Sequence, residues 1–196
     1  MDIEKLVDIL KNGGIAVIPT DTVYGIVCDA LDEEAVDKIY QLKKRSYSKP
    51  MIVLMSDMDM VKKYTKSLSK LEKKLFDTFA PGPLTVLVKK ADSIPGVVNS
   101  NLPDLGVRIP DDKDLQLLIS KLGHPIVATS ANVSSSETIT RINMLEDSIK
   151  HNVDYIYNGG SIYRGASTIV REKDNMVEIL RNGDLTENII EEFKVV

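Results

Sequence analysis

The sequence predicts an α/β fold, in which helices flank one twisted, mixed sheet, and three observations support it. Helical and strand-like patterns alternate along the chain, which indicates a central sheet with helices packed on it. The 196 residues suit a single domain, expected to span residues 1–196, and show no repeat or linker. Two strand-like runs lie close together within residues 167–181, which favours a mixed sheet over a purely parallel one.

The helices are expected where apolar residues recur at helical spacing. The first is expected at residues 3–12, with Asp2 as its N-cap and Gly13 at its end. Another near residues 69–79 must stop before Pro81, because proline cannot continue a helix. The same spacing predicts helices at residues 33–45, 112–122 and 141–150 and at the C-terminal end.

The strands are expected at short apolar runs between these helices. Residues 15–18, followed by Pro19, are the first such run, and their length and β-branching indicate a buried strand. Because ligands in α/β folds gather where loops leave the strand ends, polar residues just after these runs are candidates for a site. Further strands are expected near residues 51–55, 84–89, 105–109, 125–129, 153–157, 167–171 and 176–181.

Composition argues against several classes of protein. A net charge of −4 disfavours a protein whose main task is to coat nucleic acid. The sequence has no run of about 18 apolar residues to span a membrane, and its first residues lack the pattern of a signal peptide. The single cysteine, Cys28, cannot form an internal disulfide, which fits a reducing compartment. We therefore expect a cytoplasmic protein without a membrane partner.

Two hydroxyl-rich segments follow expected strands. Residues 19–25, Pro-Thr-Asp-Thr-Val-Tyr-Gly, place two hydroxyls, a carboxylate and a phenol in one turn. Residues 128–134 combine small side chains with hydroxyl and amide groups. Such groups can give a ligand directed hydrogen bonds. A turn bonded to its own backbone explains either segment in isolation, so both interpretations stay open.

A basic segment runs from residue 43 to residue 49. Its four cations, Lys43, Lys44, Arg45 and Lys49, would repel one another without an anion between them. Arginine offers a bidentate fork for phosphate, and lysine offers a point charge. The helix dipole also favours cations at a helix C-terminus, so phosphate binding and local helix stabilisation remain alternatives.

Several common catalytic motifs are absent from the sequence. It has neither glycine-rich nucleotide-binding motif, GxxxxGK[ST] or GxGxxG, and no serine-hydrolase turn of the form GxSxG. His124, His151 and one cysteine are too few for a His/Cys zinc site, so no protein-bound metal is expected. Arg108 and Arg181 lie within or beside expected strands, where an arginine alone often faces solvent.

Taken together, these segments resemble the Sua5/YrdC/YciO family, whose enzymes are threonylcarbamoyl-AMP synthases. The shared pattern is PT[DE]TVYG, KxR followed by KP, PGPLT, VRIP, SAN, STIV and LRxG, and all of these occur here in that order. The resemblance implies a YrdC/RibB-like fold, with a twisted mixed sheet around a deep basic concavity. It also implies the short form of the family, without an extra C-terminal domain.

The resemblance implies the reaction and its residues as well. L-threonine, bicarbonate and ATP would give threonylcarbamoyl-AMP and pyrophosphate, for t6A modification of tRNA. Four residues match the threonine-contacting positions: Thr22, Arg108, Ala128 and Ser167. The residues that match positions around the triphosphate and the nucleotide are Lys43, Arg45, Lys49, Ser130, Asn132, Thr138 and Arg181, of which Lys43 and Arg45 are expected to be catalytic.

This chemistry needs positioning and charge neutralisation rather than a protein nucleophile. The threonine amine adds to CO₂ or bicarbonate, and the resulting carbamate oxygen attacks the α-phosphate. A Lys/Arg cluster, together with Mg²⁺ on the triphosphate, would neutralise the developing charge. The implied partners are the three substrates and a downstream tRNA-modifying threonylcarbamoyl-transferase complex, with tRNA itself as a further candidate.

The sequence departs from the family pattern at five positions. Asp21 stands where glutamate is common, and Ser135 replaces the glycine that usually follows SANxS. Leu54 stands where histidine is frequent, which puts one contact to threonine in doubt. Ala166 replaces a common Glu or Pro, and Arg171 replaces a usual Asp. The last two changes leave room for an altered substrate preference.

Two other functions stay open on the sequence alone. An RNA-binding module could use the same basic concavity, although three Phe and no Trp offer few rings for base stacking. A paralogue of the family could have lost the activity, which the changes at Leu54 and Ala166 allow and the retention of Lys43 and Arg45 disfavours. Polar residues 134–140 are a candidate lid over the site.

Overall fold

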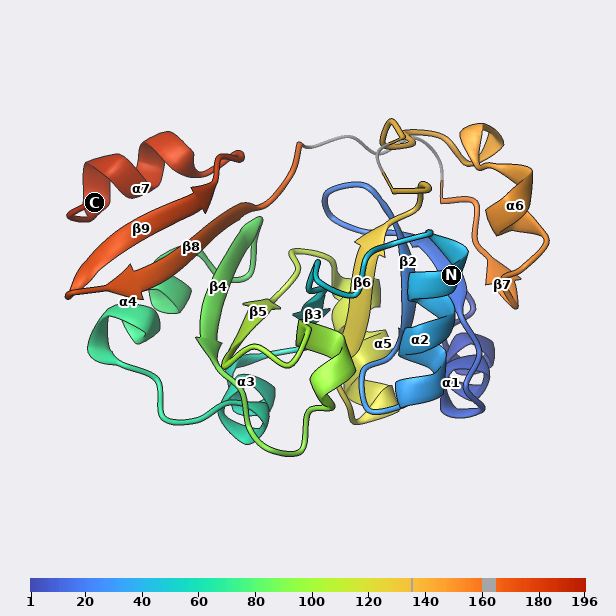
Figure 1. The fold of residues 1–196 in the computed structure, drawn as a ribbon, viewed down its shortest axis with the longest axis horizontal. Coiled ribbons are helices and arrows are strands. Elements are labelled where there is room, and N and C mark those ends of the chain that lie inside the picture. The colour runs from blue at the N-terminus through green and yellow to red at the C-terminus, as the bar shows by residue number, and fades with distance from the viewer. Residues whose placement is uncertain (135, 160–164) are drawn as a thin grey trace.

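The computed structural model describes residues 1–134, 136–159 and 165–196, and one nine-stranded sheet forms its centre (Figure 1). The strands are β1 (Ala16–Pro19), β2 (Tyr24–Asp29), β3 (Ile52–Leu54), β4 (Leu84–Lys89), β5 (Asp104–Arg108), β6 (Ile126–Ser130), β7 (Tyr155–Ile156), β8 (Thr168–Lys173) and β9 (Met176–Arg181). Their order is β7-β1-β2-β6-β3-β5-β4-β8-β9, so the sheet crosses the whole view from β7 to β9.

The sheet is mixed, as the sequence predicts. β8 and β9 pair antiparallel in a hairpin, whereas β3 pairs parallel with β5, and β4 pairs parallel with β8. The parallel pairs place Arg108 of β5 beside Leu54 of β3 and Thr168 of β8 beside Leu84 of β4, although these segments are far apart in sequence. The candidate site lies on a face of the sheet that β3, β5, β6 and β8 share.

Helices cover both faces of the sheet. They are α1 (Ile3–Lys11), α2 (Glu33–Leu42), α3 (Met58–Tyr64), α4 (Lys70–Phe79), α5 (Lys113–Leu122), α6 (Asp147–Lys150) and α7 (Thr186–Glu192), with 3-10 turns η1 (Gly96–Asn99) and η2 (Ile142–Met144). α1 and α5 pack on one face, while α2, α3 and α4 pack on the other. In the described parts of the chain, none of these helices is long and apolar enough to cross a membrane.

Alternation along the strands builds the two cores. In β1, Val17 belongs to the core under α2, α3 and α4, whereas Ala16 and Ile18 pack under α1 and α5. Cys28 lies in the former core and is completely buried, and this burial raises its thiol pKa well above the ordinary value. The cysteine is therefore a core residue, as its frequency in protein interiors suggests.

The expected helix ends are present. The carboxylate of Asp2 accepts a hydrogen bond from the backbone N–H of Lys5 at 3.1 Å, which caps α1. At the end of α5, Gly123 has φ of 81°, a left-handed conformation that costs glycine little. Ser69 and Glu72 form a reciprocal capping box at the start of α4.

One predicted helix is wrong. Residues 141–150 form the short turn η2 and then α6, because Leu145 and Glu146 between them are extended. Leu145 is buried in the core, and the Glu146 carboxylate accepts a hydrogen bond from the backbone N–H of Val133 at 3.2 Å. These long-range contacts outweigh the local helical spacing.

The sequence analysis also missed β2, α3 and η1. β2 begins at Tyr24, inside the segment interpreted as a turn, and all six of its residues are buried. A strand buried on both faces shows no polar alternation, so its sequence lacks the usual strand pattern. α3 is only seven residues long, which is too short for the periodicity to be visible.

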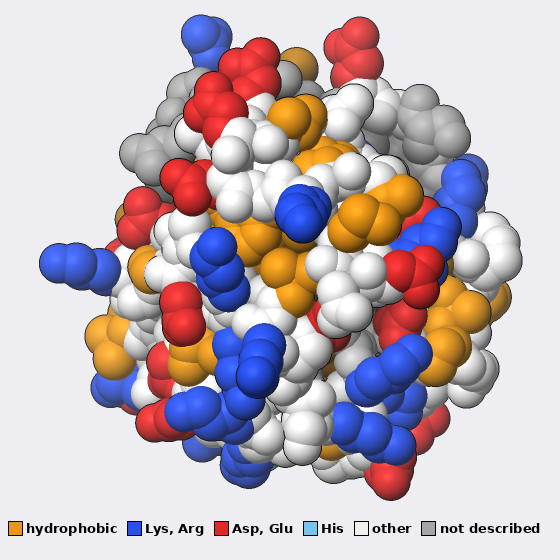
Figure 2. Space-filling model, turned by 90° about the vertical axis from the view of Figure 1, so that its left-hand side faces the viewer, with side chains coloured by type: hydrophobic (Ala, Val, Ile, Leu, Met, Phe, Trp, Pro, Cys, Tyr) orange, Lys and Arg blue, Asp and Glu red, His pale blue; other side chains and the backbone are white. Residues whose placement is uncertain are grey.

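Charges of both signs share the molecular surface. Figure 2 shows the side that carries β9 and α7, where Lys and Arg side chains lie among Asp and Glu side chains. This side therefore offers no large face of one sign, in keeping with the net charge of −4.

Candidate functional site

A cavity of about 600 Å³ lies on the sheet face that α1 and α5 cover only in part. Leu54 and Ala128 line it and also join the core under these two helices. Its wall is formed by Thr20, Thr22, Val23, Gly25, Arg45, Pro50, Met51, Ile52, Leu54, Arg108, Ala128, Thr129, Ser130, Glu137, Thr138, Gly165, Ala166, Ser167, Ile169 and Arg181.

Most of the residues singled out in the sequence meet at this cavity. The four residues expected at the threonine end all line it: Thr22, Arg108, Ala128 and Ser167. Four of the seven expected around the nucleotide also line it: Arg45, Ser130, Thr138 and Arg181. The remaining three, which do not line the cavity, are Lys43, Lys49 and Asn132.

The turn after β1 is held by one threonine and leaves the other to face the cavity. The Thr20 hydroxyl donates to the carbonyl of Val23 at 2.7 Å and accepts from the backbone N–H of Thr22 at 3.2 Å. Thr22 lines the cavity, where its hydroxyl accepts a hydrogen bond from Arg108 at 3.2 Å. The hydroxyls of Thr20 and Thr22 are also 3.0 Å apart, so the self-bonded turn includes the side chain that lines the cavity.

Arg108 and Asp21 form a buried ion pair behind this turn. The guanidinium donates to one Asp21 oxygen, and the other oxygen accepts from the backbone N–H of Asp111 at 3.0 Å. Burial lowers the pKa of Arg108, and the Asp21 carboxylate opposes that shift. Because the pair is nearly enclosed, the charge of Arg108 is compensated from within the protein.

A second arginine of the cavity wall, Arg181, lies on β9. Arg181 donates through Nε and a terminal nitrogen to the carbonyl of Ser167, at 3.0 and 2.8 Å, and also to the Ser167 hydroxyl at 2.8 Å. The Ser167 hydroxyl is 2.9 Å from that of Thr85, a fully buried residue of β4. Arg181, Ser167 and Thr85 therefore form one hydrogen-bonded row from β9 through the start of β8 to β4.

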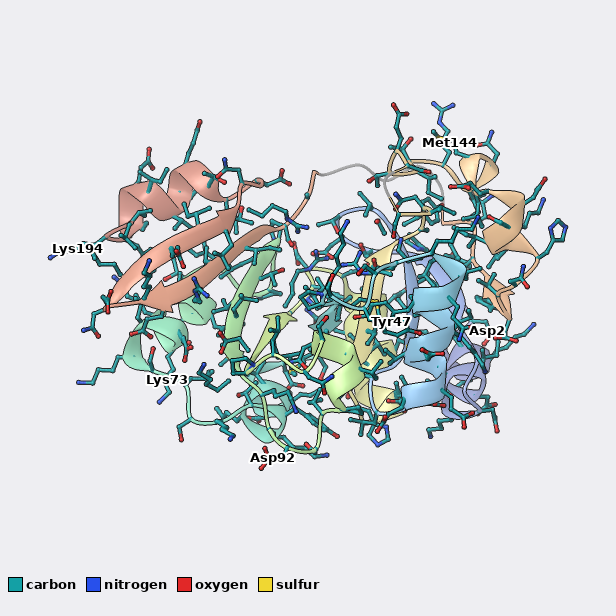
Figure 3. The ribbon with its side chains drawn as sticks, in the orientation of Figure 1. Asp2, Tyr47, Lys73, Asp92, Met144 and Lys194 are labelled. Atoms are coloured by element: carbon teal, nitrogen blue, oxygen red, sulfur yellow. The ribbon has the colours of Figure 1, made fainter. Side chains whose placement is uncertain are left out.

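Arg45 is held by the loop that it belongs to. Its Nε donates to the carbonyl of Lys49 at 2.9 Å, and a terminal nitrogen donates to the carbonyl of Pro50 at 2.8 Å. Tyr47 folds back along α2, where its ring stacks on Tyr40 with 4.6 Å between centroids (Figure 3). These contacts fix the guanidinium of Arg45 at the cavity wall, while Lys49 is exposed.

Lys43 is buried behind the wall rather than at its surface. It is the C-cap of α2 and is only 1% exposed. Its ammonium donates to the carbonyl oxygens of Ser130 and Asn132, in the segment that follows β6. Burial, and then the positive charge of Arg45, lowers the pKa of Lys43 to about 8.

The uncompensated charge of the cavity is positive. Arg45 and Arg181 have no carboxylate partner in the described parts of the chain, and Arg108 is neutralised by Asp21. Burial, and then the charge of Arg108, lowers the pKa of Arg181, although an arginine remains a cation at neutral pH. Glu137 is the acidic residue on the described wall. Such a site favours an anion that contacts both arginines.

The floor of the cavity is apolar. Ile52 and Leu54 of β3 lie beside Ala128 of β6, and Ile169 adds a further apolar side chain from β8. Apolar floors with a few directed polar groups are typical of small-molecule sites. Leu54, the position where the family often has histidine, is therefore part of the floor and pairs with Arg108 in the register of β3 and β5.

The other departures from the family pattern have different surroundings. Ala166 lines the cavity beside Ser167. Arg171 instead donates to the carboxylate of Glu178 on β9, so its side chain links the two strands of the β8–β9 hairpin. Ser135 and residues 160–164 lie outside the described residues, so the lid expected at residues 134–140 is described only in part.

Sequence reasoning missed Thr85 and Glu137 as parts of the site. Thr85 belongs to the PGPLT motif, which was noted for its order and not for a contact. A hydroxyl in an otherwise apolar strand, in Leu84-Thr85-Val86, is the signal that points to it, because a buried hydroxyl needs a partner. Glu137 lies in an irregular segment where no pattern marks it.

The described residues provide no ready-made metal cage. No group of three or more His, Cys, Asp and Glu side chains among them could hold a metal ion. Mg²⁺ that accompanies a nucleotide usually binds one or two carboxylates besides the phosphates. Glu137 on the wall fits that limited role, and a bound Mg²⁺ would otherwise depend on the phosphate oxygens.

Comparison with known proteins reveals one family. Residues 8–183 match the family model Sua5/YciO/YrdC, described as "Telomere recombination". The chain is 36% identical, over 185 residues, to a putative threonylcarbamoyl-AMP synthase of Methanocaldococcus jannaschii, covering 92% of this chain and 86% of that one. It is 31% identical, over 170 residues, to threonylcarbamoyl-AMP synthase of Bos taurus, covering 87% and 60%.

A solved structure agrees with these relatives. The crystal structure of Pyrococcus abyssi Sua5 complexed with L-threonine superposes with a TM-score of 0.90 at 28% identity, over 99% of this chain and 58% of that one. The chain thus spans most of the methanogen relative but only about three fifths of the bovine protein and of Sua5.

Proposed function

Because the chain belongs to the Sua5/YciO/YrdC family, we propose that it condenses L-threonine, bicarbonate and ATP to threonylcarbamoyl-AMP and pyrophosphate. The observation that supports this most directly is the division of the cavity. One end offers Thr22 beside a neutralised Arg108, whereas Arg45, elsewhere on the wall, and Arg181, which bonds to Ser167, have no carboxylate partners in the described chain. A zwitterionic amino acid and a polyanionic nucleotide need such different ends.

The threonine end would bind the amino acid by hydrogen bonds and shape. The hydroxyls of Thr22 and Ser167 and the guanidinium of Arg108 can bind a carboxylate and a hydroxyl. Ala128 and Leu54 would face the methyl group of threonine. The match to Pyrococcus abyssi Sua5, whose crystal structure is a complex with L-threonine, supports this assignment.

The nucleotide would lie along the wall that carries Arg45, Ser130, Thr138 and Arg181. In the reaction the threonine amine attacks bicarbonate-derived carbon, water leaves, and a carbamate forms. The carbamate oxygen then attacks the α-phosphorus, and the bond to pyrophosphate breaks. Fixed arginines stabilise the charge that develops on the transferring group without reorganising. Mg²⁺ carried by ATP would add charge neutralisation at the phosphates.

The product would serve a tRNA-modifying threonylcarbamoyl transferase. A mixed carbamic–phosphoric anhydride is reactive, so it suits immediate transfer to an amine such as that of a tRNA adenosine. We assign this partner from the family resemblance and from the product's chemistry, with tRNA as the final acceptor.

The test measures pyrophosphate release in reactions that contain ATP and bicarbonate, with and without L-threonine. Mass spectrometry identifies the adenylate product. We expect release only when threonine and bicarbonate are both present. L-alanine, which lacks the hydroxyl and has a smaller side chain, is the matched control and should release little. Nucleotide binding without release would instead indicate a paralogue without the activity. Binding of RNA without binding of nucleotide would overturn the proposal in favour of an RNA-binding module.

A further inference from the structure

We propose that Lys43 is a positioning residue, which fixes the segment after β6 at the nucleotide wall instead of binding the triphosphate itself. The proposal starts from where the side chain lies. Lys43 does not line the cavity, and its ammonium donates to the carbonyl oxygens of Ser130 and Asn132. These two carbonyls are two residues apart, so one ammonium bridges the turn that leaves the sheet.

The backbone of Lys43 adds a third connection to the same segment. Its carbonyl accepts a hydrogen bond from the backbone N–H of Ser134 at 2.9 Å. Residue 43 therefore contacts the segment 130–134 at its beginning, middle and end. Because Lys43 is the C-cap that directly follows α2 and that helix is packed in the core, the segment is tied to a rigid element.

The bridged segment presents a side chain to the cavity. Ser130 lines the wall, and the Asn132 amide donates to the carbonyls of Val133 and Ser136, at 3.1 and 2.6 Å. Without the ammonium, both bridged carbonyls would lose a charge-assisted partner in a mostly buried place. The segment would then open more often, and Ser130 would spend less time at the wall.

The neighbouring cation explains why a direct phosphate contact is not needed. Arg45, two residues on, lines the cavity and is fixed by the carbonyls of Lys49 and Pro50. The two cations of the KxR pattern therefore have different roles: Arg45 lines the cavity, and Lys43 holds the segment behind its wall. The consequence for nucleotide binding rests on the proposed function, whereas the local structural role does not.

The first test is amide hydrogen exchange, followed residue by residue by NMR in the ligand-free protein. Lys43→Met keeps an unbranched side chain but removes all three N–H donors of the ammonium group. We expect exchange at Asn132 and Ser134 to rise by about tenfold or more, the effect of losing a charge-assisted hydrogen bond. Lys44→Met, the same change at the exposed neighbour, should leave both amides as in the wild type.

The outcome at the core amides separates a local role from misfolding. Amides of β4 and β5 should keep their protection in Lys43→Met. If the β4 and β5 amides lose their protection in Lys43→Met, Lys43→Arg becomes the test variant. The N–H donors of the new arginine side chain should keep the Asn132 and Ser134 amides protected. Wild-type exchange at both amides in a folded Lys43→Met protein, or lost protection in a folded Lys43→Arg protein, would overturn the proposal.

The second test compares AMP with ATP binding. A positioning role predicts that Lys43→Met weakens both ligands by the same factor, because the segment 130–134 is disturbed before either binds. If Lys43 instead bound the phosphates directly, Lys43→Met would weaken the binding of ATP much more than that of AMP, and that result would contradict the proposal. If the wild type binds neither nucleotide, the proposed function fails while the exchange experiment still decides the role of Lys43.

Discussion

The hydroxyl of Ser167 has two hydrogen-bond partners within the protein, Thr85 and Arg181. The direction of these bonds decides whether Ser167 can donate a hydrogen bond to a ligand. Thr85 is fully buried, and the Ser167 oxygen is its hydrogen-bond partner at 2.9 Å. A buried hydroxyl that does not donate is costly, so Thr85 donates to Ser167. Arg181 also donates to the same oxygen. The proton of Ser167 is then free to point into the cavity, where an anionic oxygen of a ligand can accept it.

Replacing Thr85 with valine tests this row of donors. Thr85→Val keeps the shape and removes the donor, so we expect the KM for L-threonine to rise by about threefold to tenfold, the effect of one neutral hydrogen bond. In a Ser167→Ala background the same change should have no further effect, because Thr85 acts through Ser167. Steady-state kinetics of the four proteins give the coupling. Full additivity of the two changes would show that Thr85 acts independently of Ser167.

Arg45 and Lys49 allow a matched comparison, because both are cations of one loop and only Arg45 lines the cavity. Arg45→Ala should raise the KM for ATP by about tenfold to a hundredfold, which corresponds to the loss of a charge-assisted contact. Lys49→Ala removes an exposed charge and should change the KM for ATP by less than about threefold. Equal effects of the two variants would mean that the loop attracts ATP by its overall charge.

At this scale the sequence identifies residue types better than their positions. Motif order and the position of polar residues beside expected strands point to a shared site. Four of these residues indeed line the cavity: Thr22, Arg45, Ser130 and Arg181. The burial of Lys43 was not foreseeable, because it depends on carbonyls nearly ninety residues away along the chain. No local pattern distinguishes a cation that faces a ligand from one that holds a loop.

Among the secondary-structure elements, α4 shows how local sequence and long-range contacts combine. Ser69 caps the helix by accepting from the backbone N–H of Glu72 at 3.0 Å, and its own N–H donates to the Glu72 carboxylate at 2.7 Å. The Ser69 hydroxyl also donates to Glu172 on β8. One short side chain therefore fixes both the start of α4 and its docking to the hairpin.

Ser69→Ala should lower the free energy of unfolding by about 1–2 kcal/mol, the usual cost of removing a helix N-cap. Urea denaturation followed by circular dichroism measures it, with the slope of the transition expected to stay the same. Ser67→Ala is the control, since Ser67 is exposed two residues earlier. A loss no larger than that of Ser67→Ala would show that neither the cap nor the contact to Glu172 contributes.

Elements with clear ends were predictable, and elements defined by tertiary contacts were not. α1, α4 and α5 have caps or breakers in the sequence, and the structure confirms all three. The helix predicted at residues 141–150 is interrupted, because Leu145 enters the core and Glu146 bonds to the 130–134 segment. β2 lacks alternation because the sheet and helices bury it on both faces.

On the scale of the whole molecule, the site exists because the two faces of one sheet are covered unequally. α2, α3 and α4 close one face along much of its width, whereas α1 and α5 cover the other face only in the region of β1, β2, β6 and part of β3. The uncovered part, between β3 and β8, becomes the floor of the cavity. The alternation of α and β patterns predicted the layers, but the width of coverage depends on the strand order, which no local pattern specifies.

The buried ammonium of Lys43 should also give the stability of the whole protein a pH dependence. Its pKa is about 8 in the folded protein and 10.5 ordinarily, so between these values the unfolded chain binds a proton that the folded protein has lost. Stability therefore rises with pH across that window through this group, and its contribution is constant below about pH 8. Each unit of difference corresponds to about 1.4 kcal/mol, so the full rise is at most a few kcal/mol.

The measurement is the free energy of unfolding of the wild type and of Lys43→Met by urea denaturation, at several values between pH 7 and pH 10. The difference between the two proteins isolates Lys43, because the other titrating groups are common to both. We expect the wild type to gain stability relative to the variant as the pH rises above about 8. A difference that stays constant up to pH 10 would mean that burial does not lower the folded pKa of Lys43, because the carbonyls of Ser130 and Asn132 offset the cost of burying its charge.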